Sequence, residues 1–215
     1  MCTVTVFPLK NEGFVLTSNR DESPLREPMA PAFYQAKNTT LLYPKDKVSG
    51  GTWIGANNNY RVLCLLNGAF EKHKRALPYR QSRGKVVTDL LEDKKALTAA
   101  IKNYNFQNIE PFTLVAVDWK KKSSFYELIW DGSKKHFNEL PLIPHIWSSS
   151  TLYSKQIRAE RQQWFREFMS KNELTPESIW NFHKPATTQN KEYGVIMDRG
   201  FVKTTSITQV LKKDD

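Results

Sequence analysis

Cysteine is scarce in this sequence, which has only Cys2 and Cys64 among its 215 residues. Two cysteines are too few for the disulfide framework of a small secreted domain, and too few for the usual ligand set of a structural zinc site. Metal-ligand spacing is also absent among the four histidines, which are His73, His136, His145 and His183. We therefore expect neither a metal site nor a cofactor.

Long hydrophobic runs are absent as well. A membrane-spanning helix needs roughly 18 or more apolar residues, and no segment approaches that length. The first ten residues, MCTVTVFPLK, lack the basic start, apolar stretch and small-residue cleavage site of a secretion signal. These absences predict a protein without a membrane span, located in the cytoplasm or a similarly reducing compartment.

The charge is strongly positive, at a formal +10, but the basic residues occur in short scattered runs. No sequence pattern of an RNA- or DNA-binding fold accompanies them. Nucleic-acid binding therefore rests on charge alone, and we do not expect it. A positive surface also favours anionic small substrates. Nothing in the sequence indicates the oligomeric state.

Hydrophobic residues make up 40% of the chain, and the pattern predicts strands near both ends with helices grouped between them. Residues 2–7 and 13–18 alternate as a hairpin, whereas the three prolines in 23–31 predict a loop. Strands are also expected at 51–55, 60–66, 112–118, 125–130, 134–140, 195–197 and 201–208. We infer an α+β fold of mostly antiparallel sheets in a single domain spanning residues 1–215.

Helices are expected between the strands. Ser82 is a suitable N-cap for a helix over 84–91, and a segment at 96–104 either continues this helix or starts a new one. A longer helix is expected over 153–170, with Ile157, Trp164, Phe165 and Phe168 on its inner side. Thr175 and Pro176 fit the N-cap and first position of a further helix.

Cys2 is the first candidate for chemistry, because removal of Met1 would make it the N-terminal residue. An N-terminal cysteine combines a nucleophilic thiol with an α-amine whose ordinary pKa is about 8, so the amine can accept the thiol proton directly or through one water. The alternative is that Cys2 is an ordinary residue on a first strand. Cys64 lies among leucines and is expected to be a small buried hydrophobic residue.

The segment Asn19-Arg20-Asp21-Glu22 closes the second strand. In a short hairpin the end of strand two lies opposite the start of strand one, so Arg20 and Asp21 are expected near Cys2. Arginine would favour the thiolate, and a carboxylate could orient the amine. The alternative is a polar turn with only a structural role.

Met1-Cys2-Thr3 together with Asn19-Arg20-Asp21-Glu22 resembles the NRDE family, which includes the transport and Golgi organisation (TANGO) proteins. Further segments resemble the later blocks of that family, namely Gly50–Gly55, Ser82–Gly84, Leu65–Gly68, Trp147–Leu152 and Phe201–Thr208. The resemblance spans essentially the whole chain. Family members usually continue somewhat beyond the last of these blocks, so the C-terminal sheet edge is expected to be incomplete.

The broader resemblance is to choloylglycine hydrolases and penicillin V acylases. These are N-terminal-nucleophile (Ntn) hydrolases with an αββα four-layer sandwich, and they cleave non-peptide amide C–N bonds. The resemblance implies catalytic roles for Cys2, Arg20, Asp21 and Asn67, with Asn67 donating to the oxyanion. It implies substrate-binding roles for Asn19, Trp53, Ser149, Ser150 and Lys203.

Two of these positions depart from the pattern. Serine (Ser149 or Ser150) stands where the relatives have a second asparagine, and Lys203 replaces a late arginine. Serine reaches less far than asparagine, and lysine is a point charge rather than a planar fork. The first hypothesis is a cysteine amidohydrolase acting on linear amides through an acyl-thioester. The alternative is a non-catalytic member that binds or carries a hydrophobic ligand, lipid-like or haem, in trafficking.

Overall fold

The computed structural model describes residues 3–36, 39–76, 78–185 and 190–213 of the chain. By its internal contacts the chain divides into two compact units, residues 1–25 with 142–215 and residues 26–141. Within the described ranges, no helix is long and apolar enough to cross a bilayer. Cys2, Met1 and the last two residues lie outside those ranges.

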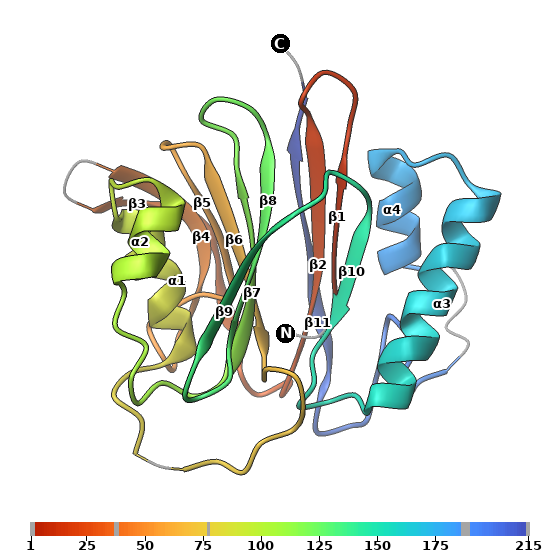
Figure 1. Cartoon of the computed structure of the whole chain (residues 1–215). Coiled ribbons are helices and arrows are strands. Elements are labelled where there is room, and N and C mark those ends of the chain that lie inside the picture. Colours follow the sequence, from red (N-terminus) through yellow and green to blue (C-terminus); the bar gives the residue numbers. More distant parts are fainter. Residues whose placement is uncertain (1–2, 37–38, 77, 186–189, 214–215) are drawn as a thin grey trace. The chain divides into compact units, whose positions relative to one another are not determined.

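The first unit is a four-stranded antiparallel sheet with the strand order β10-β1-β2-β11 (Figure 1). Its strands are β1 (Thr3–Pro8), β2 (Phe14–Glu22), β10 (His145–Ser148) and β11 (Lys203–Lys212). Helices α3 (Lys155–Lys171) and α4 (Pro176–His183) pack against this sheet.

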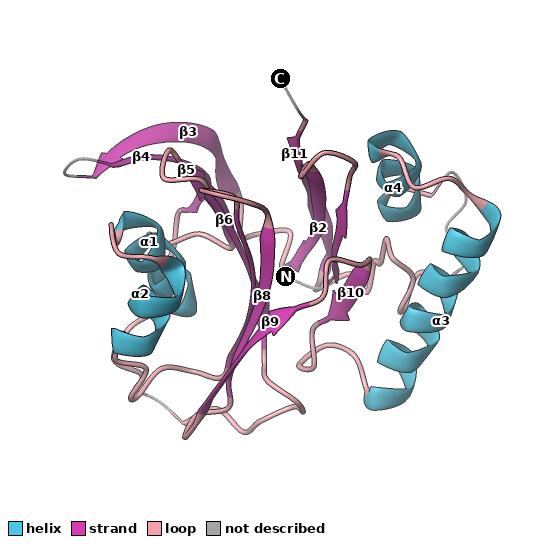
Figure 2. Ribbon diagram, turned by 45° about the horizontal axis from the view of Figure 1, so that its top comes forward, coloured by secondary structure: helices cyan, strands magenta, loops and turns pink. Residues whose placement is uncertain are grey.

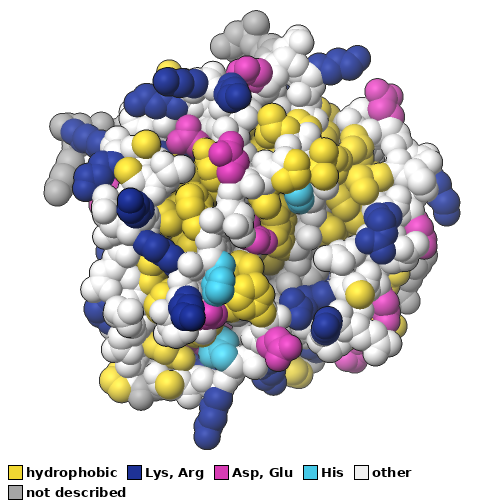
Figure 3. All heavy atoms as spheres, viewed as in Figure 1, with side chains coloured by type: hydrophobic (Ala, Val, Ile, Leu, Met, Phe, Trp, Pro, Cys, Tyr) yellow, Lys and Arg dark blue, Asp and Glu magenta, His cyan; other side chains and the backbone are white. Residues whose placement is uncertain are grey.

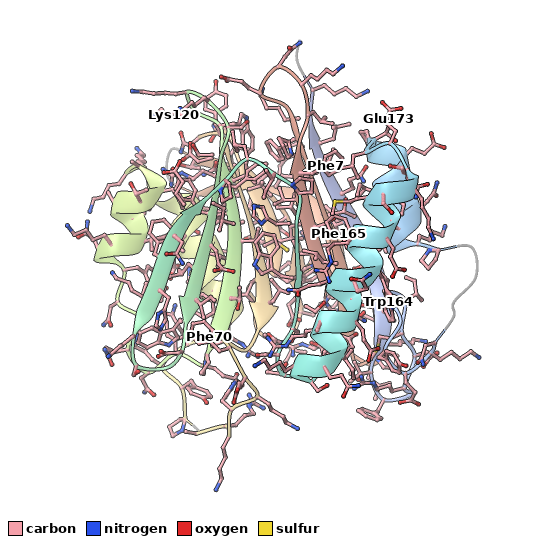
Figure 4. All side chains as sticks on the ribbon, turned by 45° about the vertical axis from the view of Figure 1, so that its right-hand side comes forward. Phe7, Phe70, Lys120, Trp164, Phe165 and Glu173 are labelled. Atoms are coloured by element: carbon pink, nitrogen blue, oxygen red, sulfur yellow. The ribbon has the colours of Figure 1, made fainter. Side chains whose placement is uncertain are left out.

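Side chains along β1 alternate between the two faces of the sheet, and this determines which of them contact the helices. Phe7 packs with Val15 of β2, Phe165 of α3 and Ile179 of α4 in one buried cluster. Figure 4 shows Phe7 on the sheet and Phe165 on the helix that covers it. Because successive strand residues point to opposite faces, Thr3 and Thr5 share this helix-covered face with Phe7.

The second unit is a seven-stranded antiparallel sheet in the order β3-β4-β5-β6-β7-β8-β9. Its strands are β3 (Pro28–Ala36), β4 (Thr39–Asp46), β5 (Ile54–Asn57), β6 (Arg61–Asn67), β7 (Phe112–Asp118), β8 (Ser124–Trp130) and β9 (Lys135–Leu140). Helices α1 (Arg83–Glu92) and α2 (Leu97–Asn103) lie on one face of it (Figure 2). Apolar residues of both helices, including Val87, Leu91 and Ile101, form one core with Leu63 and Leu65 of β6.

Helix boundaries follow the capping residues closely. The Ser82 side chain accepts a hydrogen bond from the Lys85 backbone N–H and starts α1, as expected. Thr175 and Ser178 form a capping box at the start of α4, with Pro176 in its first turn. The expected helix over 153–170 is α3, which begins two residues later, after the N-cap Ser154.

Three expectations about strands are wrong. The segment 23–31 is not all loop, because Pro28 begins β3. Proline is tolerated there since β3 is an edge strand, and its pairing register shifts between Met29 and Ala32. Residues 195–197 do not form a strand, and residues 51–53 precede β5 rather than belong to it.

Candidate functional site

The start of β1 is bordered by neighbours on both sides. Thr3 pairs with Asn19 of β2 and with Ser148 of β10. On β2, Arg20 and Asp21 follow directly after Asn19, and β11 begins opposite them at Lys203, which pairs with Glu22. The register therefore gathers residues 19–22, 148–150 and 203–205 at one end of the four-stranded sheet, which is the end where β1 begins.

The NRDE segment is strand rather than turn, since all four of its residues lie within β2. Arg20 is 2% exposed, and its guanidinium donates to the Thr205 hydroxyl at 3.0 Å. The same hydroxyl donates to the Arg20 carbonyl at 3.1 Å, at the irregular register between Thr204 and Ser206. The side chain and backbone of Arg20 are thus both held by β11.

Asp21 is also 2% exposed, and both of its carboxylate oxygens accept hydrogen bonds. The Tyr153 hydroxyl donates to Oδ2 at 2.9 Å, and the Thr204 hydroxyl donates to Oδ1 at 2.5 Å. Two donors thus hold the two oxygens of this buried carboxylate. Asp21 is thereby fixed as an oriented acceptor at the sheet end where β1 begins.

Asn19 links β2 to the helical layer through His183. Its Nδ2 donates to the carbonyls of His183 (3.1 Å) and Val195 (2.8 Å), so its Oδ1 is the acceptor for the His183 ring. His183 Nδ1 therefore carries the proton at 2.5 Å from that oxygen, and Nε2 accepts from the Thr5 hydroxyl at 2.8 Å. These contacts bind Asn19 within the unit, and its substrate-binding role remains a prediction.

His183 is 0% exposed, and burial lowers the pKa of its imidazole from 6.5 to about 3, with the nearby positive charge of Arg161 adding to the effect. The neutral ring is the form that fits the observed hydrogen bonds. A proton on Nε2 would leave that nitrogen without an electron pair for the Thr5 hydroxyl. His183 is thus a neutral structural group beneath β1 and β2.

Arg161 is 0% exposed although it is always charged. Its guanidinium donates to the Thr3 hydroxyl and to the carbonyls of Tyr193 and Gly194, and it stacks 3.7 Å from the Tyr153 ring centre. No carboxylate pairs with it in the part of the chain that the structure describes. Arg161 and Tyr153 therefore connect Thr3, the neighbour of Cys2 in sequence, with Asp21.

Sequence reasoning missed Arg161, Tyr153 and His183, although a signal for two of them existed. Arg161 lies four residues after Ile157 and four before Phe165, on the apolar side of α3. His183 lies four residues after the buried Ile179 of α4. A polar residue on an apolar helical stripe must find hydrogen-bond partners inside the protein, and both of these face the sheet.

The predicted substrate-binding residues of the first unit lie at the same sheet end. Ser149 and Ser150 are buried and directly follow β10, and the Ser149 hydroxyl lies 3.0 Å from that of Thr151. Lys203 is half-buried at the start of β11, and its backbone forms an isolated antiparallel β-bridge with that of Asp198. These residues lie at the sheet end that carries Arg20 and Asp21, and their substrate-binding roles remain predictions.

Asn67 and Trp53 belong to the second unit. Asn67 is the half-buried last residue of β6, and Gly68 follows with a positive φ of 85°. Trp53 is buried just before β5, and its carbonyl accepts from the Leu65 N–H at 2.8 Å. Cys64, midway along β6, is 0% exposed, as its leucine-rich surroundings predict.

The glycines before Trp53 have a local explanation. A Cβ at Gly51 would lie 2.4 Å from the carbonyl carbon of Gly84, so the two glycines allow the segment before β5 to contact the start of α1. The Thr52 N–H also donates to the Gly84 carbonyl at 3.3 Å. The segments Gly50–Gly55 and Ser82–Gly84, both of which resemble blocks of the family, are therefore in contact with each other.

Comparison with known proteins identifies the family of the chain and proteins of similar fold. The family model described as Transport and Golgi organisation 2 matches residues 1–206. No curated protein matches the sequence significantly. Among solved structures, the Caenorhabditis elegans N-acylethanolamine-hydrolyzing acid amidase ortholog is similar at 13% identity with a TM-score of 0.63, covering 89% of each chain.

Penicillin V acylase from Agrobacterium tumefaciens is similar at 11% identity with a TM-score of 0.55, covering 97% of this chain and 79% of that one. At such low identity the likeness concerns the fold alone. It confirms the predicted α+β, Ntn-hydrolase-like fold with mostly antiparallel sheets.

Proposed function

The chain belongs to the Transport and Golgi organisation 2 family, and from that premise we propose that it is an N-terminal-cysteine hydrolase of non-peptide, linear amides. The observation that carries the proposal is the buried arrangement at the start of β1. There a held arginine, Arg20, and an oriented carboxylate, Asp21, stand beside the strand that follows Cys2. The Ntn-hydrolase-like fold supports the same reading.

In the proposed reaction, loss of Met1 exposes the α-amine of Cys2, which accepts the thiol proton. The thiolate attacks the amide carbonyl carbon, and a tetrahedral oxyanion forms. Collapse of this intermediate breaks the C–N bond, and the leaving amine takes the proton back from the ammonium. Water then hydrolyses the acyl-thioester, which releases a carboxylic acid and restores the thiol.

Each supporting residue has one task in this scheme. Arg20 favours the thiolate by its positive charge, and Asp21 holds the α-ammonium in place. Asn67 donates a hydrogen bond to the oxyanion, an assignment that follows from the family resemblance. Ser149, Ser150, Lys203 and Trp53 bind the substrate, whereas Asn19, whose amide is engaged with His183 and Val195, holds β2 in place.

The direct test measures intact mass before and after treatment with a p-nitrophenyl acyl ester, which acylates activated thiols. We expect protein lacking Met1 and a single acyl group on the N-terminal peptide. Cys2→Ser should abolish this labelling at neutral pH, whereas Cys64→Ser, the matched control, should leave it intact. Full retention of Met1, or equal labelling of the Cys2→Ser variant, would refute the mechanism.

Turnover is tested separately with an N-acyl anilide as the amide substrate. Asn67→Ala should lower kcat by about 10²–10³-fold, which is typical of losing one oxyanion donor, while leaving the rate of thiol alkylation unchanged. A protein that is acylated at Cys2 but never releases the acyl group would support the alternative, a family member that binds a hydrophobic ligand without hydrolysing amides.

A further inference from the structure

A cavity lies in the helical layer of the first unit. It has a volume of about 340 Å³ and opens between α3, α4 and the segment 194–196. None of Arg20, Asp21, Ser149, Ser150 or Lys203 lines it. Figure 4 labels Trp164, one of the α3 residues in its wall, and Figure 3 shows hydrophobic side chains gathered over α4.

Among the described residues that line this cavity, none carries a charged side chain. Its apolar part consists of Trp164, Phe168, Phe182, Pro185, Val195 and Ile196, and the remainder is asparagine and glycine. A quarter of the whole chain is charged, so an uncharged wall is a distinctive property. An ionic ligand would lose its hydration here without gaining a counter-charge, and the cavity therefore favours a neutral molecule.

The asparagines of the cavity wall differ in whether their side chains are available to form a hydrogen bond with a ligand. Asn172 donates its amide N–H to the Phe168 carbonyl at 2.8 Å and keeps its side-chain oxygen as an acceptor. Asn190 uses its oxygen to accept from the backbone N–H groups of residues 192 and 193. Across the described ranges, no protein group bonds to the Asn181 amide, which therefore offers both a donor and an acceptor.

The cavity wall is anchored from below. Asn19 of β2 donates to the carbonyl of Val195, which is a wall residue. It also donates to the carbonyl of His183, which follows the wall residue Phe182 in sequence. Arg161 donates to the carbonyl of Gly194, another wall residue. A wall held by buried hydrogen bonds is preformed, so a ligand would not have to order it on binding.

We propose that this cavity binds a small uncharged molecule with a flat apolar body and a single amide, carbonyl or hydroxyl group. The volume of the cavity limits the size of the apolar body that it can accommodate. A cavity of about 150 Å³ accommodates benzene, so about twice that volume accommodates a two-ring body. Stacking on the aromatic wall holds the body, and Asn181 pairs with the polar group.

The test uses the full chain and two probes of equal shape, 2-naphthamide and 2-naphthoate, with binding followed by NMR of the indole N–H signals. The six tryptophans give six such signals, and loss of one in Trp164→Phe assigns Trp164. We expect naphthamide to shift the Trp164 signal saturably and naphthoate to bind at least about tenfold more weakly. Binding of naphthoate as tight as that of naphthamide would overturn the proposal, because the +10 chain attracts anions non-specifically.

Two variants locate the binding. Asn181→Trp places a large ring in the cavity from an exposed position on α4 and should abolish naphthamide binding, while Asn181→Ala should weaken it several-fold. Gln162→Trp, on an exposed position of α3 outside the cavity wall, is the matched control and should bind like the wild type. Absence of a Trp164 shift in the wild type, or undiminished binding in Asn181→Trp with its melting temperature unchanged, would overturn the proposal.

Discussion

Protonation of His183 should make the protein lose stability as the pH falls from 7 to 5. The folded protein holds this imidazole neutral with a pKa of about 3, whereas in the unfolded chain its pKa is near 6.5. The unfolded state therefore binds more protons throughout this interval, and the free energy of unfolding falls with acidification. Above pH 6.5 protonation of His183 does not affect the free energy of unfolding. Between pH 6.5 and about pH 3 this free energy falls progressively.

The size of the effect follows from the shift. Below pH 6.5 each pH unit lowers the free energy of unfolding by about 1.4 kcal/mol, so His183 alone accounts for a loss of about 2 kcal/mol at pH 5. That is a substantial part of the 5–15 kcal/mol typical of folded domains. Replacing His183 by Gln removes the titrating group while keeping a polar side chain at the site. The variant should be less stable than the wild type at pH 7, and this difference should shrink by about 2 kcal/mol at pH 5.

The assay is urea unfolding of the wild type and His183→Gln at pH 7, 6 and 5, with His136→Gln as the control. His136 is partly exposed on β9, next to Asp131, so its variant should keep the His183-linked pH dependence. Native-state NMR should also find the His183 ring signals unchanged between pH 8 and 5. A stability difference that stays constant with pH, or a His183 ring that titrates near pH 6 in the folded protein, would refute the reasoning.

Three further predictions concern other parts of the chain. Iodoacetamide should alkylate Cys2 faster than Cys64 at neutral pH, because Cys64 is fully buried; equal rates in the native state would argue against an activated thiol. Tyr153→Phe removes a donor from the buried Asp21 carboxylate, so chemical denaturation should show a loss of about 1–3 kcal/mol. Gly84→Ala places a Cβ 2.9 Å from a backbone oxygen and should lower the melting temperature by several degrees, which calorimetry would detect.

The regular elements could be predicted where one local signal sufficed. Ser82 and Thr175 identified helix starts because a capping side chain bonds to backbone only three residues away. The short apolar run at 112–118 identified a strand that is buried on both faces for a similar reason. The strand at Pro28 could not be predicted, because its prolines are tolerated only at a sheet edge, and edge position is a property of the assembled sheet.

The candidate site was predictable only in part. Arg20 and Asp21 were expected at the start of the first strand, since a hairpin brings strand ends together. Two of their partners, Thr205 and Thr204, lie more than 180 residues away in sequence, and no local pattern links them. The buried His183 also escaped prediction, because its identity as a neutral hydrogen-bonding group depends on Asn19 and Thr5 lying opposite it.

The pairing of β2 with β11 joins two strands that are synthesised far apart in time. About 180 residues separate Glu22 from its β11 partner Lys203. Ribosomes add roughly 5–20 residues per second, so β2 waits on the order of ten seconds or more for the strand that holds Arg20 and Asp21. Residues 26–141 emerge in between and can form their own sheet first. The segment that carries Arg20 and Asp21 therefore gains its β11 contacts only after Lys203–Lys212 has left the ribosome.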